Sequence, residues 1–206
     1  MTLTMGMLAS ARRASTYTYN GTYNPTTSGT SFTYTAAPLG TAASTRLIVV
    51  VITTRGGGTT TISSVTLGGS AMTKAVETSS TNDDAFIYYL ASSSGTTADI
   101  VATFTTSQAA CTISTYSLYN LTSNTPNATG SGLTGTATIS AAANDIVIAG
   151  ATKRGVSANT WTNVTSDFAA AAGSTGSYTS HGSKKQTASI SSVVSTLDQI
   201  SAAAWR

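Results

Sequence analysis

The sequence predicts an all-β protein built as a sandwich or a barrel. Apolar residues recur with period two or in short solid runs, and almost nowhere at the spacing of a helix. The expected strands are short, lie about ten residues apart and are separated by clusters of Gly, Ser and Asn, which is typical of sandwiches and barrels. Threonine is abundant, and it favours strands because its branched Cβ packs well on a pleated surface.

The composition limits the class of protein. Only 8% of the 206 residues are charged, against about 25% in ordinary soluble domains. The longest strongly apolar run, Leu47–Ile52, is far shorter than the ~20 residues of a membrane-spanning helix, so we expect no membrane segment. Hydrophobic residues make up 40% of the chain and occur in regularly spaced clusters, which argues against disorder.

Residues 1–44 differ in composition from the rest of the chain. They are rich in Tyr, Thr and Gly, and contain no Leu, Ile, Val or Met between Leu8 and Leu39. We expect an extended N-terminal arm there, with one or two strands at Thr16–Tyr19 and Ser31–Thr35. Residues 45–206 are expected to form the compact sandwich domain. The sequence leaves open whether the arm pairs with its own sheet or with that of a neighbouring subunit.

The first strand of the expected domain is the solid apolar run Leu47–Thr53. A run of this length without polar alternation predicts a central strand that is covered on both faces. Helix has little support, with single turns conceivable at 169–172 and Ser192–Leu197. The other expected strands are Thr61–Leu67, Ala71–Glu77, Ala85–Ala91, Asp99–Thr105, Thr112–Leu121, Thr134–Ser140, Asp145–Ala151, Asn163–Phe168, Tyr178–His181, Gln186–Ile190 and Gln199–Trp205.

Glycine-rich stretches mark the expected turns. Gly68-Gly69 stands between two short alternating runs and predicts a two-residue hairpin, because glycine tolerates positive φ best. We interpret this pair as structural rather than as a ligand loop. Strand breakers at 56–58, 123–132 and 170–176 predict further turns.

Several segments resemble a known family. The segments are TRLIVVVITTR at 45–55, SVTLGGSAMTKA at 64–75, FIYYLASSSGTTADIVATFT at 86–105 and SAAANDIVIAGATKRG at 140–155, followed by the closing ISAAAW. Their order resembles a jelly-roll-like β-sandwich domain of bacteriophage structural proteins and bacterial surface proteins. The chain departs from the family pattern at Leu67, Tyr88 and Asn144, where an aromatic residue, Trp and Gly are usual.

The resemblance covers about four fifths of the chain and implies a jelly-roll-like antiparallel β-sandwich. It says little about function, because one fold hosts many functions.

The inventory of reactive side chains gives little support to an enzyme. The single histidine, His181, is expected on a surface loop, and without a second His, a nearby Cys or clustered acids it lacks the ligand set of a zinc site. No G-x-S-x-G elbow or phosphate-binding loop occurs. A Ser-His-Asp arrangement stays open, since serines abound and Asp167 and Asp198 are available. We expect no catalytic residue and no cofactor.

Cysteine and the acids suggest structural roles. Cys111 is alone, so no internal disulfide can form, and we expect it as a small buried hydrophobic residue. Asn82-Asp83-Asp84 is a local acidic cluster that could help to bind calcium, but the full spacing of a calcium loop is missing. We therefore predict no metal site.

Aromatic side chains are the candidates for contact with a ligand or a partner. Sandwich domains often bind glycans by stacking, and Trp161 lies beside an expected turn with Tyr178 farther along the chain. In the arm, Tyr17, Tyr19 and Tyr23 cluster near Tyr34. Packing in the core or on a sheet surface is the alternative for each of them.

The basic residues predict no nucleic-acid binding. The net charge of +3 reflects a shortage of acids, and Arg12-Arg13, Lys153-Arg154 and Lys184-Lys185 are isolated pairs. In the first fifteen residues the Arg pair follows the weakly apolar part, whereas a secretory signal places its positive charge first, so we expect no secretion by that route.

These observations, with the resemblance, favour a structural role in a virus particle. The first hypothesis is a bacteriophage virion protein that decorates the capsid as a cement protein and is assembled in the host cytoplasm. It would form a homotrimer, with residues 1–44 anchoring it to the major capsid protein or to other virion proteins. The alternative is a tail-fibre or adhesin module that binds host-surface glycans. A polysaccharide-active enzyme is a remote third hypothesis.

Overall fold

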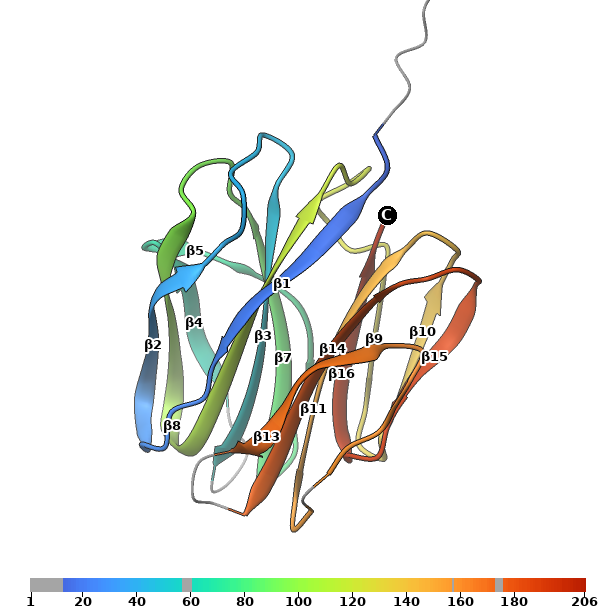
Figure 1. Cartoon of the computed structure of the whole chain (residues 1–206). Coiled ribbons are helices and arrows are strands. Elements are labelled where there is room, and N and C mark those ends of the chain that lie inside the picture. Colours follow the sequence, from blue (N-terminus) through green and yellow to red (C-terminus); the bar gives the residue numbers. More distant parts are fainter. Residues whose placement is uncertain (1–12, 57–60, 157, 173–175) are drawn as a thin grey trace, which may run out of the picture.

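The computed structural model describes residues 13–56, 61–156, 158–172 and 176–206. In these ranges it contains sixteen strands and no helix, and every strand pairing is antiparallel (Figure 1). This architecture confirms the predicted all-β, jelly-roll-like antiparallel sandwich.

The first sheet curls back on itself because its longest strand, β8 (Thr97–Tyr119), belongs to two layers. The first half of β8 pairs with β2 (Gly29–Pro38) and β4 (Ile62–Leu67). The second half pairs with β1 (Thr16–Tyr23) and β3 (Leu47–Gly56). Layer 1 thus consists of β2, the first half of β8, β4 and β5 (Ser70–Ala71), whereas layer 2 consists of β1, the second half of β8, β3, β7 (Asp83–Ala91) and β6 (Thr73–Thr78).

Two further sheets complete a stack of four layers, visible from left to right in Figure 1. Layer 3 has the order β13 (Thr165–Ala172), β14 (Ser177–Lys185), β11 (Ile146–Arg154), β16 (Gln199–Trp205) and β9 (Ala128–Gly132). Layer 4 has the order β10 (Thr136–Ala141), β15 (Ile190–Ser195) and β12 (Trp161–Thr162).

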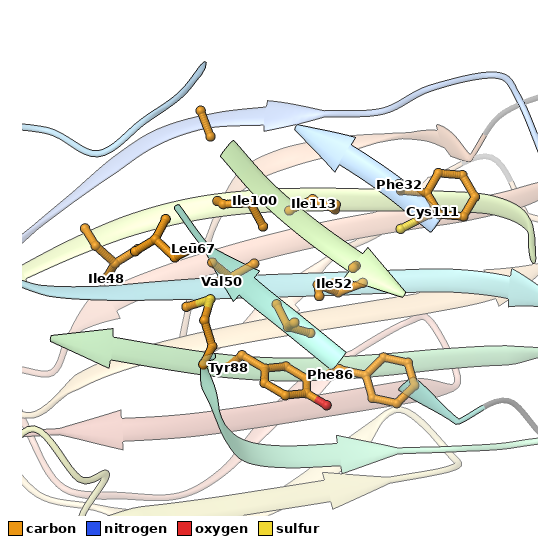
Figure 2. Close-up of a cluster of buried hydrophobic side chains, with 14 of the residues drawn as sticks. Phe32, Ile48, Val50, Ile52, Leu67, Phe86, Tyr88, Ile100, Cys111 and Ile113 are labelled. Carbon is orange, nitrogen blue, oxygen red and sulfur yellow. The ribbon is translucent and has the colours of Figure 1, made fainter. Parts of the chain in front are cut away.

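Three apolar cores separate the four layers. The first core lies between layers 1 and 2, and Figure 2 shows Ile48, Val50 and Ile52 in a row along β3 within it. The middle core lies between layers 2 and 3, and the last core between layers 3 and 4. Because side chains alternate along a strand, β3 sends its other residues, such as Val49, into the middle core. The prediction of a central strand covered on both faces is confirmed.

Layers 2 and 3 approach closely at a glycine of β11. A Cβ on Gly150 would lie 2.4 Å from Val51 Cγ1, and 3.6 Å from atoms of both Thr53 and His181. Real Cβ atoms do not come that close to a neighbour, so the hydrogen side chain of Gly150 allows β11 to pack against β3.

The Gly68-Gly69 hairpin is confirmed. Gly68 and Gly69 have φ of 54° and 81°, and Leu67 pairs with Ser70 across the turn. Positive φ at both central residues defines the two-residue turn that matches the twist of the flanking strands.

Several predicted elements are wrong in detail. Asp99–Thr105 and most of Thr112–Leu121 belong to the single strand β8. The proposed helical turn at 169–172 lies in β13, and most of the one at Ser192–Leu197 lies in β15. Pairing with β14 and β10 outweighs the helix propensity of alanine and serine there. Gln186–Ile190 is mostly a turn, with β15 beginning at Ile190.

The glycine-rich stretch 123–132, expected as a turn, contains the strand β9. A Cβ on Gly130 would lie 2.1 Å from the carbonyl oxygen of Thr138, and one on Gly132 would lie 1.9 Å from that of Thr136. These glycines therefore permit the close approach of β9 to β10. In the sequence alone, the same glycines look like a turn signal. Of the run at 56–58, Gly56 ends β3, and the other two residues lie outside the described ranges.

The described part of residues 1–44 joins the sheet of its own chain. Both β1 and β2 pair with β8, one with each half of the long strand. Asn24, between them, donates from Nδ2 to the carbonyl oxygen of Ala171 on β13 at 3.0 Å. Two layers of the stack thus depend on strands from this segment.

We expect Gly150→Ala to lower the free energy of unfolding by about 1–3 kcal/mol, because the added methyl group overpacks the middle core against Val51. Urea unfolding measures this change. In a Val51→Ala background, Gly150→Ala should lower the free energy of unfolding by clearly less, since the truncated side chain makes room for the new methyl group.

Gly29→Ala is the matched control for this substitution. The nearest atom to its added Cβ is the Ser31 carbonyl oxygen at 3.6 Å, an ordinary contact, so a change below about 0.5 kcal/mol is expected. Equal effects of the two alanines would show that β11 does not pack closely on β3.

Candidate functional site: a polar pocket beside strand β1

The structure contains a pocket of about 610 Å³ between the start of β1, the end of β8 and the connection from β2 to β3. Its volume lies within the roughly 300–1,000 Å³ of small-molecule sites. It is lined by Arg13, Thr16, Thr18, Gly40, Thr41, Ala43, Ser44, Thr45, Tyr119 and Asn120.

Strand pairing places one wall of this pocket. Thr16 pairs directly with Tyr119, and Thr18 with Ser117, so Thr16, Thr18 and Tyr119 share one face of layer 2. The opposite wall is the β2–β3 connection, from Gly40 to Thr45.

Hydrogen bonds hold the two walls together. The Tyr119 hydroxyl donates to the carbonyl oxygen of Thr41 at 3.0 Å, and the Thr45 hydroxyl donates to Asn120 Oδ1 at 3.2 Å. Asn120 Nδ2 donates to the carbonyl oxygen of Ala14 at 3.3 Å. Asn120 has a φ of 57°, a left-handed conformation that asparagine tolerates better than most residues. The pocket is therefore pre-formed.

Position 40 in the pocket wall requires a glycine, both for its backbone conformation and for the space available. Its φ is +66°, and an added Cβ would lie 2.8 Å from the Tyr119 hydroxyl oxygen. A larger residue would displace Tyr119 and with it one side of the pocket.

The side chain of Arg46 fixes the β2–β3 connection by hydrogen bonds. Its side chain is buried, and its guanidinium donates to the carbonyl oxygens of Leu39, Gly40, Ser92 and Ser94 at 3.1, 3.2, 2.7 and 2.6 Å. Hydrogen bonds with a charged donor are stronger than neutral ones, so this arginine ties the connection to the turn between β7 and β8.

The predicted tyrosine cluster is divided between two cores. Tyr17 and Tyr19 pack against the middle core, and the rings of Tyr19 and Tyr116 lie 5.4 Å apart. A bulge between Tyr19 and Gly21 reverses the alternation of β1, so Tyr23 packs against the first core instead, stacked on Tyr34 at 5.5 Å. The structure does not bring these three tyrosines of β1 into one patch.

Trp161 and Tyr178 both pack, half-buried, against the last core. Trp161 lies on β12 in layer 4, and its indole N–H donates to Ser180 Oγ on β14 at 2.8 Å. This bond joins layers 3 and 4, so Trp161 has a packing role whatever else it contacts.

The expectation for His181 is wrong. It lies on β14, fully buried at the interface of layers 2 and 3. Its Nδ1 is 2.5 Å from Ser114 Oγ, and its Nε2 is 3.0 Å from Thr53 Oγ1. Burial lowers the pKa of His181 to about 3, so the ring is neutral at physiological pH. The sequence around it, with Gly and two Lys following, suggests a loop, but these residues continue a paired strand.

The acids of the chain are engaged in structural contacts. Ser177 donates to Asp83 Oδ1 at 3.0 Å, and the backbone N–H of Ser80 donates to Asp84 Oδ1 at 2.8 Å. Burial raises the pKa of Asp83 and of Asp167. Within the described ranges, no three His, Cys, Asp or Glu side chains gather in a way that could hold a metal ion.

Cys111 is a free, buried residue of the first core, as predicted, and burial raises the pKa of its thiol.

The pocket residues were not predicted from the sequence. Hydroxyl side chains occur along the whole chain, so nothing distinguishes Thr16 or Thr18 from the others. Asn120 precedes Leu-Thr and matches a glycosylation triplet, which is expected by chance in so threonine-rich a chain. Its left-handed backbone and its bridging role are visible only in three dimensions.

Comparisons with known proteins find no family model that fits the chain, and no significant match among curated proteins or solved structures. The described part of the chain has no helix with the length and apolar character needed to cross a bilayer.

Because of His181, we expect the free energy of unfolding to decrease as the pH is lowered. The unfolded chain has an ordinary histidine pKa near 6.5, whereas the folded pKa is about 3, so the unfolded state binds more protons between these values. The free energy of unfolding then decreases as pH falls below about 6.5 and levels off near the folded pKa.

His181→Gln should remove this part of the pH dependence. From pH 7 to 4.5 the native protein should lose about 2–3 kcal/mol more than the variant in urea unfolding. Asp83 and Asp167 are present in both proteins, so their opposite contributions cancel in the comparison. Parallel curves would show that His181 is not held neutral.

Proposed function

We propose that the chain is a non-catalytic structural protein of a bacteriophage virion, placed on the capsid surface as a decoration protein. The resemblance of residues 45–155 and the closing strand to phage structural domains supports this proposal. The observation that carries it is the edge strand β13, which offers a surface for subunit assembly.

Strand β13 is an edge strand of layer 3, and its protective features, Asp167 and a bulge between Ser166 and Phe168, lie in its first half. It pairs with β14 alone, and six of its eight residues are Thr, Ser or Ala. The carbonyl oxygen of Ala171 accepts a hydrogen bond from Asn24, so it points away from β14. Edge strands are normally protected by charge or proline, as β6 is by the Lys74–Glu77 ion pair. The second half of β13, Phe168–Ala172, has no charge, proline or bulge and suits strand addition by another subunit.

The outer faces of the stack also suit assembly. The exposed residues of β2 include Ser31 and Thr33, and those of β10 include Thr136 and Thr138. Short side chains lose less conformational entropy on docking than Lys, Glu or Arg do. A subunit can therefore cover these faces at low entropic cost.

The proposal predicts that the protein is present in purified particles of the phage that encodes it. Mass spectrometry should detect many copies per particle, and labelled antibody should bind the head. Absence of the chain from the particles would end the proposal, and labelling of the tail alone would replace it with the adhesin hypothesis.

A charge on β13 tests the assembly surface. Ala169 is exposed, and Ala169→Lys should reduce the copy number on the particle about tenfold, because a lysine on an edge strand opposes pairing. Thr138→Lys is the matched control, since this residue is also exposed but β9 covers the edge of β10. Equal copy numbers for both variants, with unchanged melting temperatures, would exclude β13 as the contact.

A further inference from the structure

We propose that the pocket beside β1 binds an acidic saccharide, with Arg13 pairing with its carboxylate. The inference does not depend on the virion proposal, because it is drawn from the chemistry of the pocket alone.

The lining of the pocket favours a polyhydroxylated ligand. Eight of its ten lining residues have side chains that form hydrogen bonds, with Gly40 and Ala43 the exceptions. The lining thus combines hydrogen-bonding groups with apolar surface, as the surface of a sugar ring does. Hydroxyl groups both donate and accept, as do those of a sugar.

Arg13 adds the preference for a negative charge. It is the one charged residue among the ten that line the pocket, and it is exposed. No carboxylate in this lining competes for it. The planar guanidinium donates two parallel hydrogen bonds to a carboxylate, a geometry that a point charge such as Lys does not offer.

Tyr119 and the rigidity of the walls complete the site. The Tyr119 hydroxyl is held by Thr41, which fixes the position of its ring in the lining. Aromatic rings combine an apolar face with a polar tip, which suits the mixed surface of a sugar ring. Because Arg46 and Asn120 fix the walls in the free protein, little conformational entropy is lost when a ligand binds.

The test uses the full chain and two probes with the same sugar backbone, trigalacturonate and its uncharged methyl ester. Calorimetric titration at low salt should show binding of trigalacturonate and at least tenfold weaker binding of the ester. Absence of binding at millimolar trigalacturonate, or equal binding of both probes, would overturn the proposal. Triglutamate is a third probe, and binding as tight as that of trigalacturonate would mean that the pocket recognises acidic peptides instead.

Two variants assign the binding to this pocket. Arg13→Gln should weaken trigalacturonate binding at least tenfold and remove the difference between the acid and its ester. Thr18→Val should weaken binding of both, since Thr18 is exposed and lines the pocket without supplying charge.

Arg154→Gln is the matched control, an exposed arginine on β11 outside the pocket lining. It should leave the affinity unchanged. If Arg154→Gln and Arg13→Gln weaken binding equally, the effect is one of net charge and the site assignment is wrong.

Discussion

The burial of β3 on both faces is the constraint on which the rest of the structure depends. A strand of ten residues with eight buried in succession needs an apolar layer on each side. Layer 1 covers one face through the curled sheet, and layer 3 covers the other through β11 and β16. A shift of one residue would exchange Ile48 and Val49 between two differently shaped cores, so the register of β3 fixes both sandwiches together.

The low charge of the chain follows from this arrangement. Four stacked layers place many polar side chains inside, where an unpaired charge is costly. Hydroxyl groups meet the demand instead, as Thr53 and Ser114 do around His181. The charged residues that are buried, Arg46, Asp83, Asp84 and Asp145, all have hydrogen-bond partners or ion pairs. Arg46, for example, is surrounded by carbonyl oxygens from loops that need donors. Threonine and serine thus serve both as strand formers and as the internal hydrogen-bonding groups of the stack.

Local patterns made most strands predictable, whereas long-range packing did not. Period-two alternation and Gly68-Gly69 identify β4 and its hairpin because both signals act over a few residues. The continuity of β8 depends on partners far along the chain, and the glycines of β9 serve a neighbouring strand. His181 shows the same limit, since its burial depends on β14 packing against layer 2. The pocket combines residues that are distant in sequence, so only the fold reveals it.

The two proposed contact surfaces, β13 and the pocket beside β1, would recognise their partners by different short-range interactions. This follows from the small number of charges on the chain. A chain with few charged residues generates a weak long-range field, so long-range electrostatics contributes little to its choice of partner. Selectivity must then come from contact. At β13 the proposed contact is backbone pairing, which tolerates many partner sequences. At the pocket it is Arg13, whose charge is the only one in a lining of hydroxyls and amide. The proposed distinction between an acid and its neutral ester rests on this one guanidinium.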